Sequence, residues 1–415
     1  ILTNKVLFKK YKINRIIGKG SFGCVFKGVN IKDNSDVALK VEKKNSSIHL
    51  LELESNFLSI LKGYGIPQLK SYGISGNFYI LVEELLGSNL ADIFAKLKAF
   101  PLKDLSMLAI QIIDRMEFIH SKNIIHRDIK PENFTTGYKN TSVIYIIDFG
   151  ISKKYRSSRT GKHLKFRLTG KMFGTVRYVS YNGSRGVELS RRDDLESIGY
   201  MLIYLHKGKL PWQGLRFKEM NIKKKYLEML YLKKFLKPET LCNGLPSEYS
   251  EYIRYCKNLN FEQDPDYEFL RNLFRSVLSK MNEINDMKFS WIKNKSIKNK
   301  SIKNNKSTEN VINNSKEKYI NLLKRKESSQ KRLYRAIQHS LEKSKKERKN
   351  MAKSKSELIN LKNNSLENKS NNEIIQRVKS LNRYEEFNND LDNSNISKDV
   401  LSYNSLLAQY NFNES

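Results

Sequence analysis

Two short stretches near the middle of the chain carry acidic, amide and basic side chains at a spacing suited to phosphate chemistry. Residues 125–133 read IHRDIKPEN, and residues 146–150 read IIDFG. Carboxylate and amide oxygens are ligands that Mg²⁺ accepts, and Mg²⁺ commonly accompanies phosphate groups. A site for phosphoryl transfer must position the reactants and neutralise their charge. Asp128, Asn133 and Asp148 are therefore candidates for a site of metal-assisted phosphoryl transfer.

The order and spacing of these residues match the catalytic loop and the metal-binding triplet of protein kinases. On that match, Asn133 and Asp148 would hold Mg²⁺ ions that bridge the phosphates of ATP. Asp128 would accept or orient the proton of the attacking hydroxyl group. Lys130 stands two residues after Asp128, as in Ser/Thr kinases, and would contact the γ-phosphate.

A glycine-rich stretch, GKGSFG at residues 18–23, lies between two runs that predict strands. Glycine allows a tight turn and a close approach of backbone N–H groups to a phosphate. Alone, the pattern fits a plain hairpin equally well, but a strand after it argues against a dinucleotide fold. The residues predicted to contact the nucleotide are Gly18, Lys19, Gly20, Ser21, Phe22, Gly23, Val25, Ala38, Lys40, Glu84 and Leu86.

Lys40 closes the apolar run VALK at residues 37–40. A lysine on an edge strand would point to solvent, whereas a lysine after a glycine-rich hairpin matches the kinase residue that holds the α- and β-phosphates. A buried ammonium group needs a counter-charge. Glu54 is the favoured partner and Glu52 the alternative, so the predicted catalytic set is Asp128, Lys130, Asn133, Lys40 and Glu54.

The elements that would position these residues change in character along the chain. Short β-branched runs predict strands over residues 13–17, 24–29, 37–41 and 78–85, with a helix over 50–61. A longer helix is predicted over 105–120, where Leu105, Leu108, Ile112, Met116 and Ile119 form one apolar stripe. The predicted fold is α+β and bilobal, with a small β-rich lobe (1–87) and a larger helical lobe (88–291).

Residues 292–415 differ sharply in composition, as in KNKSIKNKSIKNNKS. So few apolar groups cannot offset the entropy of ordering the chain, and we predict a largely disordered tail. Of the formal charge of +33, the tail carries +13 and residues 1–291 carry +20. Residues 316–349 allow two interpretations: a solvated segment, or a basic amphipathic helix that contacts nucleic acid or an anionic membrane.

The three cysteines are far apart and show no metal-ligand spacing, which favours a reducing compartment. No apolar run is long enough for a membrane span. We expect a monomer in the cytoplasm, the nucleus or both.

Several stretches resemble the casein kinase I family of Ser/Thr protein kinases. They are DRMEFIHSKNIIHRDIKPENF, IDFGISKKYR, RRDDLESIGY and LPWQGL, and Ser180-Tyr181-Asn182 stands where most kinases have Ala-Pro-Glu. The resemblance covers residues 11–291. It implies a bilobal kinase fold, ATP and Mg²⁺ as cofactors, and transfer to Ser or Thr near a phosphorylated or acidic residue.

The resemblance also implies two anion sites for such substrates. Arg177 and Lys225 fall where the family binds a priming phosphate, and Arg127, Lys153 and Lys171 fall on its second anion site. Each of them could instead be an ordinary solvated charge. The family often autophosphorylates its C-terminal extension, so autoinhibition by the tail is a further hypothesis.

Asp194 matches the aspartate that braces the catalytic loop, and Trp212 is expected in the core. Two departures from the family concern the adenine pocket. Glu83 occupies the gatekeeper position at its inner end, and Thr135 replaces an apolar residue of its floor. Our hypothesis is an unusually polar inner pocket, because a buried carboxylate must be paired or protonated. A shift of the match by one residue would make Glu83 an outward residue, and a catalytically inert pseudokinase is the alternative function.

Overall fold

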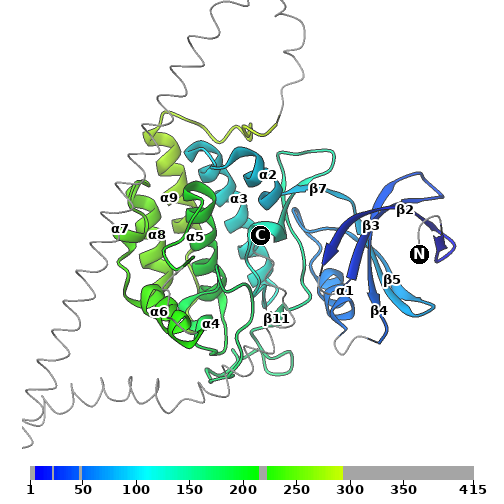
Figure 1. Cartoon of the computed structure of the whole chain (residues 1–415), viewed down its shortest axis with the longest axis horizontal. Helices are drawn as coiled ribbons and strands as arrows, with labels where there is room; N and C mark the ends of the chain where they lie inside the picture. Colours follow the sequence, from blue (N-terminus) through cyan, green and yellow to red (C-terminus); the bar gives the residue numbers. More distant parts are fainter. Residues whose placement is uncertain (1–4, 21–22, 46–48, 215–221, 293–415) are drawn as a thin grey trace, which may run out of the picture. The chain divides into compact units, whose positions relative to one another are not determined.

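The computed structural model describes residues 5–20, 23–45, 49–214 and 222–292. Within these ranges a group of strands with one helix precedes a mainly helical part, as Figure 1 shows in blue and in cyan to yellow-green. The strands and helices thus follow the order that the sequence predicts. The proposed tail lies outside the described residues apart from Ile292, and so does its alternative helix over 316–349.

An antiparallel sheet forms the first part of the described chain, and its strand order is β1-β2-β3-β4-β6-β5. Its members are β1 (Val6–Leu7), β2 (Tyr11–Gly20), β3 (Gly23–Asn30), β4 (Asp36–Lys43), β5 (Leu69–Ser75) and β6 (Phe78–Glu84). Helix α1 (Leu50–Ile60) connects β4 to β5 and contacts the sheet through both strands and β6. This arrangement lets α1 present a side chain to β4.

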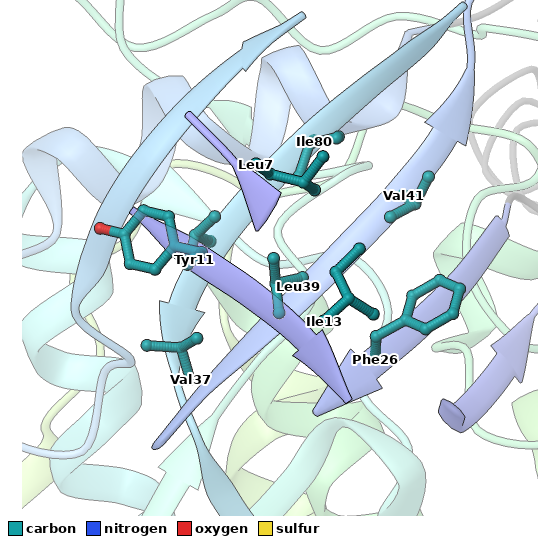
Figure 2. Close-up of a cluster of buried hydrophobic side chains, with 9 residues drawn as sticks. Leu7, Tyr11, Ile13, Phe26, Val37, Leu39, Val41 and Ile80 are labelled. Atoms are coloured by element: carbon teal, nitrogen blue, oxygen red, sulfur yellow. The ribbon is translucent and has the colours of Figure 1, made fainter. Parts of the chain in front are cut away.

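One face of the sheet packs into a hydrophobic cluster (Figure 2). Its buried members are Leu7, Tyr11, Ile13, Phe26, Val37, Leu39, Val41, Ile80 and Val82. Alternate residues of a strand point to opposite faces. The pattern Val37, Leu39, Val41 therefore fixes one face of β4 in this cluster and leaves Ala38 and Lys40 on the other face.

A second small sheet joins the two parts of the fold. Within the described residues its strand order is β10 (Ile144–Ile146), β9 (Phe134–Gly137) and β7 (Leu86–Asn89). The predicted lobe boundary at residues 87 and 88 falls within β7. Across the two parts, Lys27 Nζ donates to the Tyr138 hydroxyl at 3.1 Å.

The helical part is built around α3 (Leu102–Ser121), which packs against α5 (Arg191–Lys207) and α9 (Tyr267–Lys280). All five residues of the predicted α3 stripe are buried. Met107, Ala109 and Ile113 outside the stripe are buried as well, so α3 is a central helix rather than an amphipathic one. It begins three residues before the predicted start because Pro101 stands at its N-cap.

The remaining elements complete the helical part around the site. They are α2 (Leu90–Leu97), β8 (Ile124–Ile125), the 3₁₀ turn η1 (Pro131–Asn133), β11 (Lys153–Lys154), α4 (Tyr181–Ser184), α6 (Ile222–Phe235), α7 (Pro238–Leu241) and α8 (Ser247–Asn258). A capping box formed by Ser190 and Asp193 begins α5. No helix in the described ranges combines the length and apolar character that crossing a bilayer requires.

Candidate active site

The glycine-rich loop lies at the turn between β2 and β3, one strand away from Lys40. Val25 of β3 pairs with Gly18 on one side and with Lys40 on the other. A Cβ atom on Gly23 would lie 2.0 Å from the carbonyl oxygen of Val41, so the loop requires glycine there. Ser21 and Phe22 lie outside the described residues, and for Lys19 only the backbone in β2 is described.

Lys40 forms the predicted ion pair with Glu54 of α1. Lys40 Nζ lies 2.6 Å from Glu54 Oε1, and only 2% of Glu54 is exposed. Glu52, the alternative partner, is exposed. Glu54 Oε1 also accepts a hydrogen bond from Phe149 N at 3.4 Å, which links this pair to the IIDFG stretch.

Charge is unbalanced around Lys40, since three carboxylates surround one ammonium group. Burial lowers the pKa of Lys40, but these carboxylates, Glu54, Glu83 and Asp148, outweigh burial and hold that pKa above its ordinary value. Burial raises the pKa of Glu54 to about 7, because the attraction of Lys40 offsets only part of the penalty. One ammonium group thus faces three carboxyl groups, and a divalent cation bound beside them would stabilise their charged forms.

Asp128 is the centre of a hydrogen-bonded cluster in the catalytic loop. Its Oδ2 lies 2.6 Å from Lys130 Nζ and accepts from Asn133 Nδ2 at 3.2 Å. Its Oδ1 accepts from the Thr175 hydroxyl at 3.0 Å. Burial lowers the pKa of Lys130, but the charge of Asp128 outweighs this and raises it. These contacts fix the carboxylate where a substrate hydroxyl group would approach.

Asp194 of α5 braces the catalytic loop, as the sequence predicts. Its two carboxylate oxygens accept from His126 N at 2.8 Å and from Arg127 N at 2.9 Å. Two successive N–H groups point at one carboxylate because Arg127 has a left-handed backbone, with φ +70°. His120 also lies 3.1 Å from Asp194 through Nε2, and its Nδ1 lies 2.6 Å from the Tyr267 hydroxyl of α9.

Asn133 and Asp148 provide the oxygen ligands expected for a metal ion. Asn133 Nδ2 donates to the carbonyl oxygen of Asp128 at 2.8 Å, which leaves the side-chain oxygen of Asn133 available to a cation. Ile147 N donates to the Asn133 carbonyl oxygen at 2.9 Å and so places Asp148 beside Asn133. An amide oxygen and a carboxylate are hard ligands that suit Mg²⁺ with phosphate oxygens and water completing its shell. The donor set fits the predicted cofactor.

The protein kinase domain family model matches residues 11–381 of the chain. The chain belongs to the protein kinase family. Members of this family transfer a phosphoryl group to proteins, generally from ATP with Mg²⁺. In this kinase, Lys40 pairs with Glu54 and Asn133 donates to Asp128, whereas the catalytic and metal-binding roles of these residues stay predictions.

Glu83 points inward from β6, so the alternative of an outward residue is wrong. It pairs with Ala38 across the β4–β6 ladder, is 4% exposed, and places Oε1 3.2 Å from Lys40 Nζ. Burial raises the pKa of Glu83, and the charge of Lys40 opposes that shift. Among the residues that the structure describes, neither Glu83 Oε2 nor the Thr135 hydroxyl has a hydrogen-bond partner. Both atoms are buried and lack partners, and the polar inner pocket that the sequence suggests stays a prediction.

Three residues predicted to contact the nucleotide, Ala38, Glu84 and Leu86, lie in β4, β6 and β7. Leu86 of β7 pairs with Gly137, and Ala38 is buried opposite Glu83. The carboxylate of Glu84 is bonded to Tyr145 Oη and to Gln68 N, each at 3.3 Å. The N–H group of Glu84 also donates to the Gln68 carbonyl oxygen at 3.0 Å, and the contact of Glu84 with a nucleotide stays a prediction.

Two residues predicted for the second anion site have partners within the protein. Arg127 Nε donates to the Ile151 carbonyl oxygen at 2.6 Å, and its guanidinium lies over the Phe173 ring. Lys153 Nζ lies 2.6 Å from the buried carboxylate of Glu188. Glu188 also pairs with Arg167, whose Nε lies 2.9 Å from Glu188 Oε2, so one carboxylate is shared by two cations and one positive charge remains. The exposed side chain of Lys171 has no such carboxylate among the described residues, and the anion site itself stays a prediction.

Arg177 and Lys225 lie on different elements of the helical part. The Arg177 guanidinium lies 5.1 Å from the Tyr204 ring centre and 5.7 Å from that of Tyr178. Lys225 is exposed in α6. Trp212 is buried, as predicted, and its Nε1 donates to the Arg177 carbonyl oxygen at 2.8 Å.

Three residues of the site were not predicted from the sequence. Thr175 donates to the Asp128 carboxylate, Glu188 pairs with Lys153 and Arg167, and Lys233 of α6 donates to the Val179 carbonyl oxygen. Thr175 lies in GTVRY, but no local pattern distinguishes Glu188 or Lys233 from the many other charged residues. Their contacts join residues that are far apart in the sequence.

Proposed function

We propose that this kinase transfers the γ-phosphoryl group of ATP to Ser or Thr side chains of proteins, as a casein kinase I type enzyme. The observation that carries the proposal is the Asp128 cluster. Lys130 lies 2.6 Å from one carboxylate oxygen and Thr175 donates to the other. A lysine at this position is the Ser/Thr-kinase pattern, and the chain resembles casein kinase I in the stretches around it.

Each residue of the cluster has a defined part in the proposed reaction. Asp128 orients the acceptor hydroxyl and takes its proton as the O–P bond forms. Lys130 stabilises negative charge on the transferred group, and Lys40 binds the phosphates that remain on the leaving nucleotide. Asn133 and Asp148 would hold Mg²⁺, which supplies charge neutralisation at the phosphates.

The preference for acidic or phosphorylated substrates rests on charge and on the resemblance. Residues 1–291 carry a formal charge of +20, which attracts anionic peptides. Thr175 donates to the carboxylate of Asp128, and the cationic side chain of Arg177 lies only two residues further along the chain. A substrate anion near its acceptor residue would be recognised there.

The test uses the full chain and Mg-ATP with two peptides. They are identical except that a serine three residues before the acceptor is either phosphorylated or not. A third peptide carries Tyr as the acceptor, and Asp128→Asn is the control, expected to lower kcat by about a hundredfold or more. Faster transfer to Ser in the phosphorylated peptide supports the proposal.

Three other results would count against parts of the proposal. Transfer without preference for the phosphorylated peptide would remove the substrate preference. Transfer to Tyr at a similar rate would remove the Ser/Thr assignment. Absence of transfer by folded protein that binds ATP would favour the pseudokinase.

A further inference from the structure

Lys233 is a buried lysine of α6 whose ammonium group meets neutral oxygen atoms and lies 5.4 Å from the centre of the Trp212 ring. It is 1% exposed, and its Nζ donates to the carbonyl oxygens of Val176 at 2.9 Å and Val179 at 2.7 Å. A third bond reaches the Ser184 hydroxyl at 3.0 Å. The three N–H donors of the ammonium group thus match three acceptors. Within the described ranges, no carboxylate lies within ion-pair distance of it.

Such a group is expensive to bury, since the charged form loses water without gaining a counter-ion. Burial lowers the pKa of Lys233 to about 7, and the charge of Glu196 opposes this shift only in part. A methionine would fill similar space without that penalty. The use of lysine at this position therefore calls for a reason beyond packing.

The reason lies in the segment that Lys233 holds. Residues 176–179 contain Arg177, the predicted contact for a substrate anion. Lys233 binds the carbonyl oxygens of Val176 and Val179, and Trp212 binds that of Arg177. Three of the four carbonyl groups in this segment are thus fixed from the interior. With the backbone held in this way, the Arg177 guanidinium lies over the rings of Tyr178 and Tyr204.

Lys233 itself is rigidly supported. Lys257 of α8 donates to the Lys233 carbonyl oxygen at 2.7 Å, so the backbone of α6 is fixed to a neighbouring helix at that residue. On the other side of the segment, Thr175 is bonded to Asp128. The 176–179 backbone therefore connects a buried cation to the catalytic carboxylate.

We propose that Lys233 is a positioning residue for substrate recognition, which holds the 176–179 backbone so that Arg177 can bind an acidic or phosphorylated group of the substrate. This inference rests on the proposed substrate preference. Without Lys233, two carbonyl groups and a hydroxyl group would lack donors in a dry interior, and the segment would rearrange to satisfy them. Arg177 would then lose its place relative to the acceptor.

The experiment measures kcat/KM of the full chain for the phosphorylated and unphosphorylated peptides and takes their ratio. This ratio does not depend on the fraction of active enzyme. For Lys233→Met we expect the ratio to fall about tenfold, mainly through KM for the phosphorylated peptide. The kcat for the unphosphorylated peptide should stay within about threefold of wild type. Lys237→Met removes an equal charge from an exposed position four residues later and should leave the ratio unchanged.

An unchanged ratio in Lys233→Met, or equal losses on both peptides, would overturn the inference. If wild type itself shows no preference, the proposed substrate preference fails and the inference fails with it. Trp212→Phe provides a second route should Lys233→Met not fold, because it removes the N–H donor to Arg177 and keeps an aromatic ring. A lower ratio in this variant supports the role of the held segment, and an unchanged ratio contradicts it.

Discussion

Lys40, which is largely buried, and Lys233, which is fully buried, have opposite surroundings in this kinase. Lys40 lies among the carboxylates of Glu54, Glu83 and Asp148, and its pKa is raised despite burial. Lys233 lies among carbonyl and hydroxyl oxygens, and burial lowers its pKa to about 7. Full opposite charges compensate for the loss of water, whereas neutral dipoles do so only in part.

These different surroundings correspond to two different roles of a lysine side chain. An ammonium group held by carboxylates remains charged and can meet the phosphates of a nucleotide. An ammonium group surrounded by carbonyl oxygens instead holds in place the backbone segment to which those oxygens belong. Substitutions at the two positions should therefore affect different measured quantities.

The largest effect is expected for Lys40→Met. Loss of the cation leaves three carboxylates without compensation where phosphates must bind, so kcat/KM should fall by about a hundred- to a thousandfold. Peptide phosphorylation over a range of ATP concentrations measures this. Lys44→Met, an exposed lysine next to β4, is the matched control. A loss below tenfold for Lys40→Met would contradict the role of Lys40.

Glu83→Met should alter ligand selection around Lys40. An ATP-competitive compound with an apolar group that reaches past residue 83 would cover the unsatisfied Oε2 atom in wild type. It should bind Glu83→Met at least about tenfold more tightly, which corresponds to about 1.4 kcal/mol. Calorimetry with the compound and with its analogue lacking that group measures the difference. Equal affinity of the first compound for both proteins would show that Glu83 does not make the pocket polar.

Lys233→Met should change how stability depends on pH. Lys233 titrates near 10.5 in the unfolded chain and near 7 in the folded protein, so the folded state binds fewer protons between these values. The free energy of unfolding of wild type should therefore rise relative to that of Lys233→Met between pH 7 and 10, by up to about 1.4 kcal/mol per pH unit. Urea unfolding at pH 7, 8 and 9 tests this. A difference that stays flat with pH would mean that Lys233 titrates normally.

The smallest effects are expected where lysines are exposed. Lys44→Met and Lys237→Met should each change the free energy of unfolding by less than about 0.5 kcal/mol, because neither side chain is buried. The same urea series measures both variants. A change above about 1 kcal/mol in the free energy of unfolding of either variant would contradict the expectation that exposed lysines contribute little to stability.

The residues of the candidate active site could be proposed from the sequence because they lie in short motifs with fixed spacing. Asp128 and Asn133 are five residues apart in one loop, and Asp148 lies two residues after the end of β10. Lys40 follows a glycine-rich hairpin, and the helical run around Glu54 is close in sequence. The two short sheets formed by β7, β9, β10 and by β8, β11 were not predicted, since strands of two to four residues show too little alternation.

Other residues around the site have partners that are distant in the sequence, and no local sequence pattern predicts those contacts. Lys233 resembles its neighbour Lys234 in sequence, and only the packing of α6 against the 176–179 segment makes one of them buried. Lys153 pairs with Glu188, which lies 35 residues away in the sequence and also pairs with Arg167. In both cases tertiary packing determines the partners of the lysine, and no local sequence pattern predicts them.

The contacts of Asp194 have a consequence for how activity is lost on heating. They fix the backbone of the catalytic loop to α5, and through His120 and Tyr267 to α3 and α9. A loop with bonds of its own could fray early, while the rest of the fold persisted. Here opening of the loop would break contacts with the central helices, so we expect the loop to melt together with them.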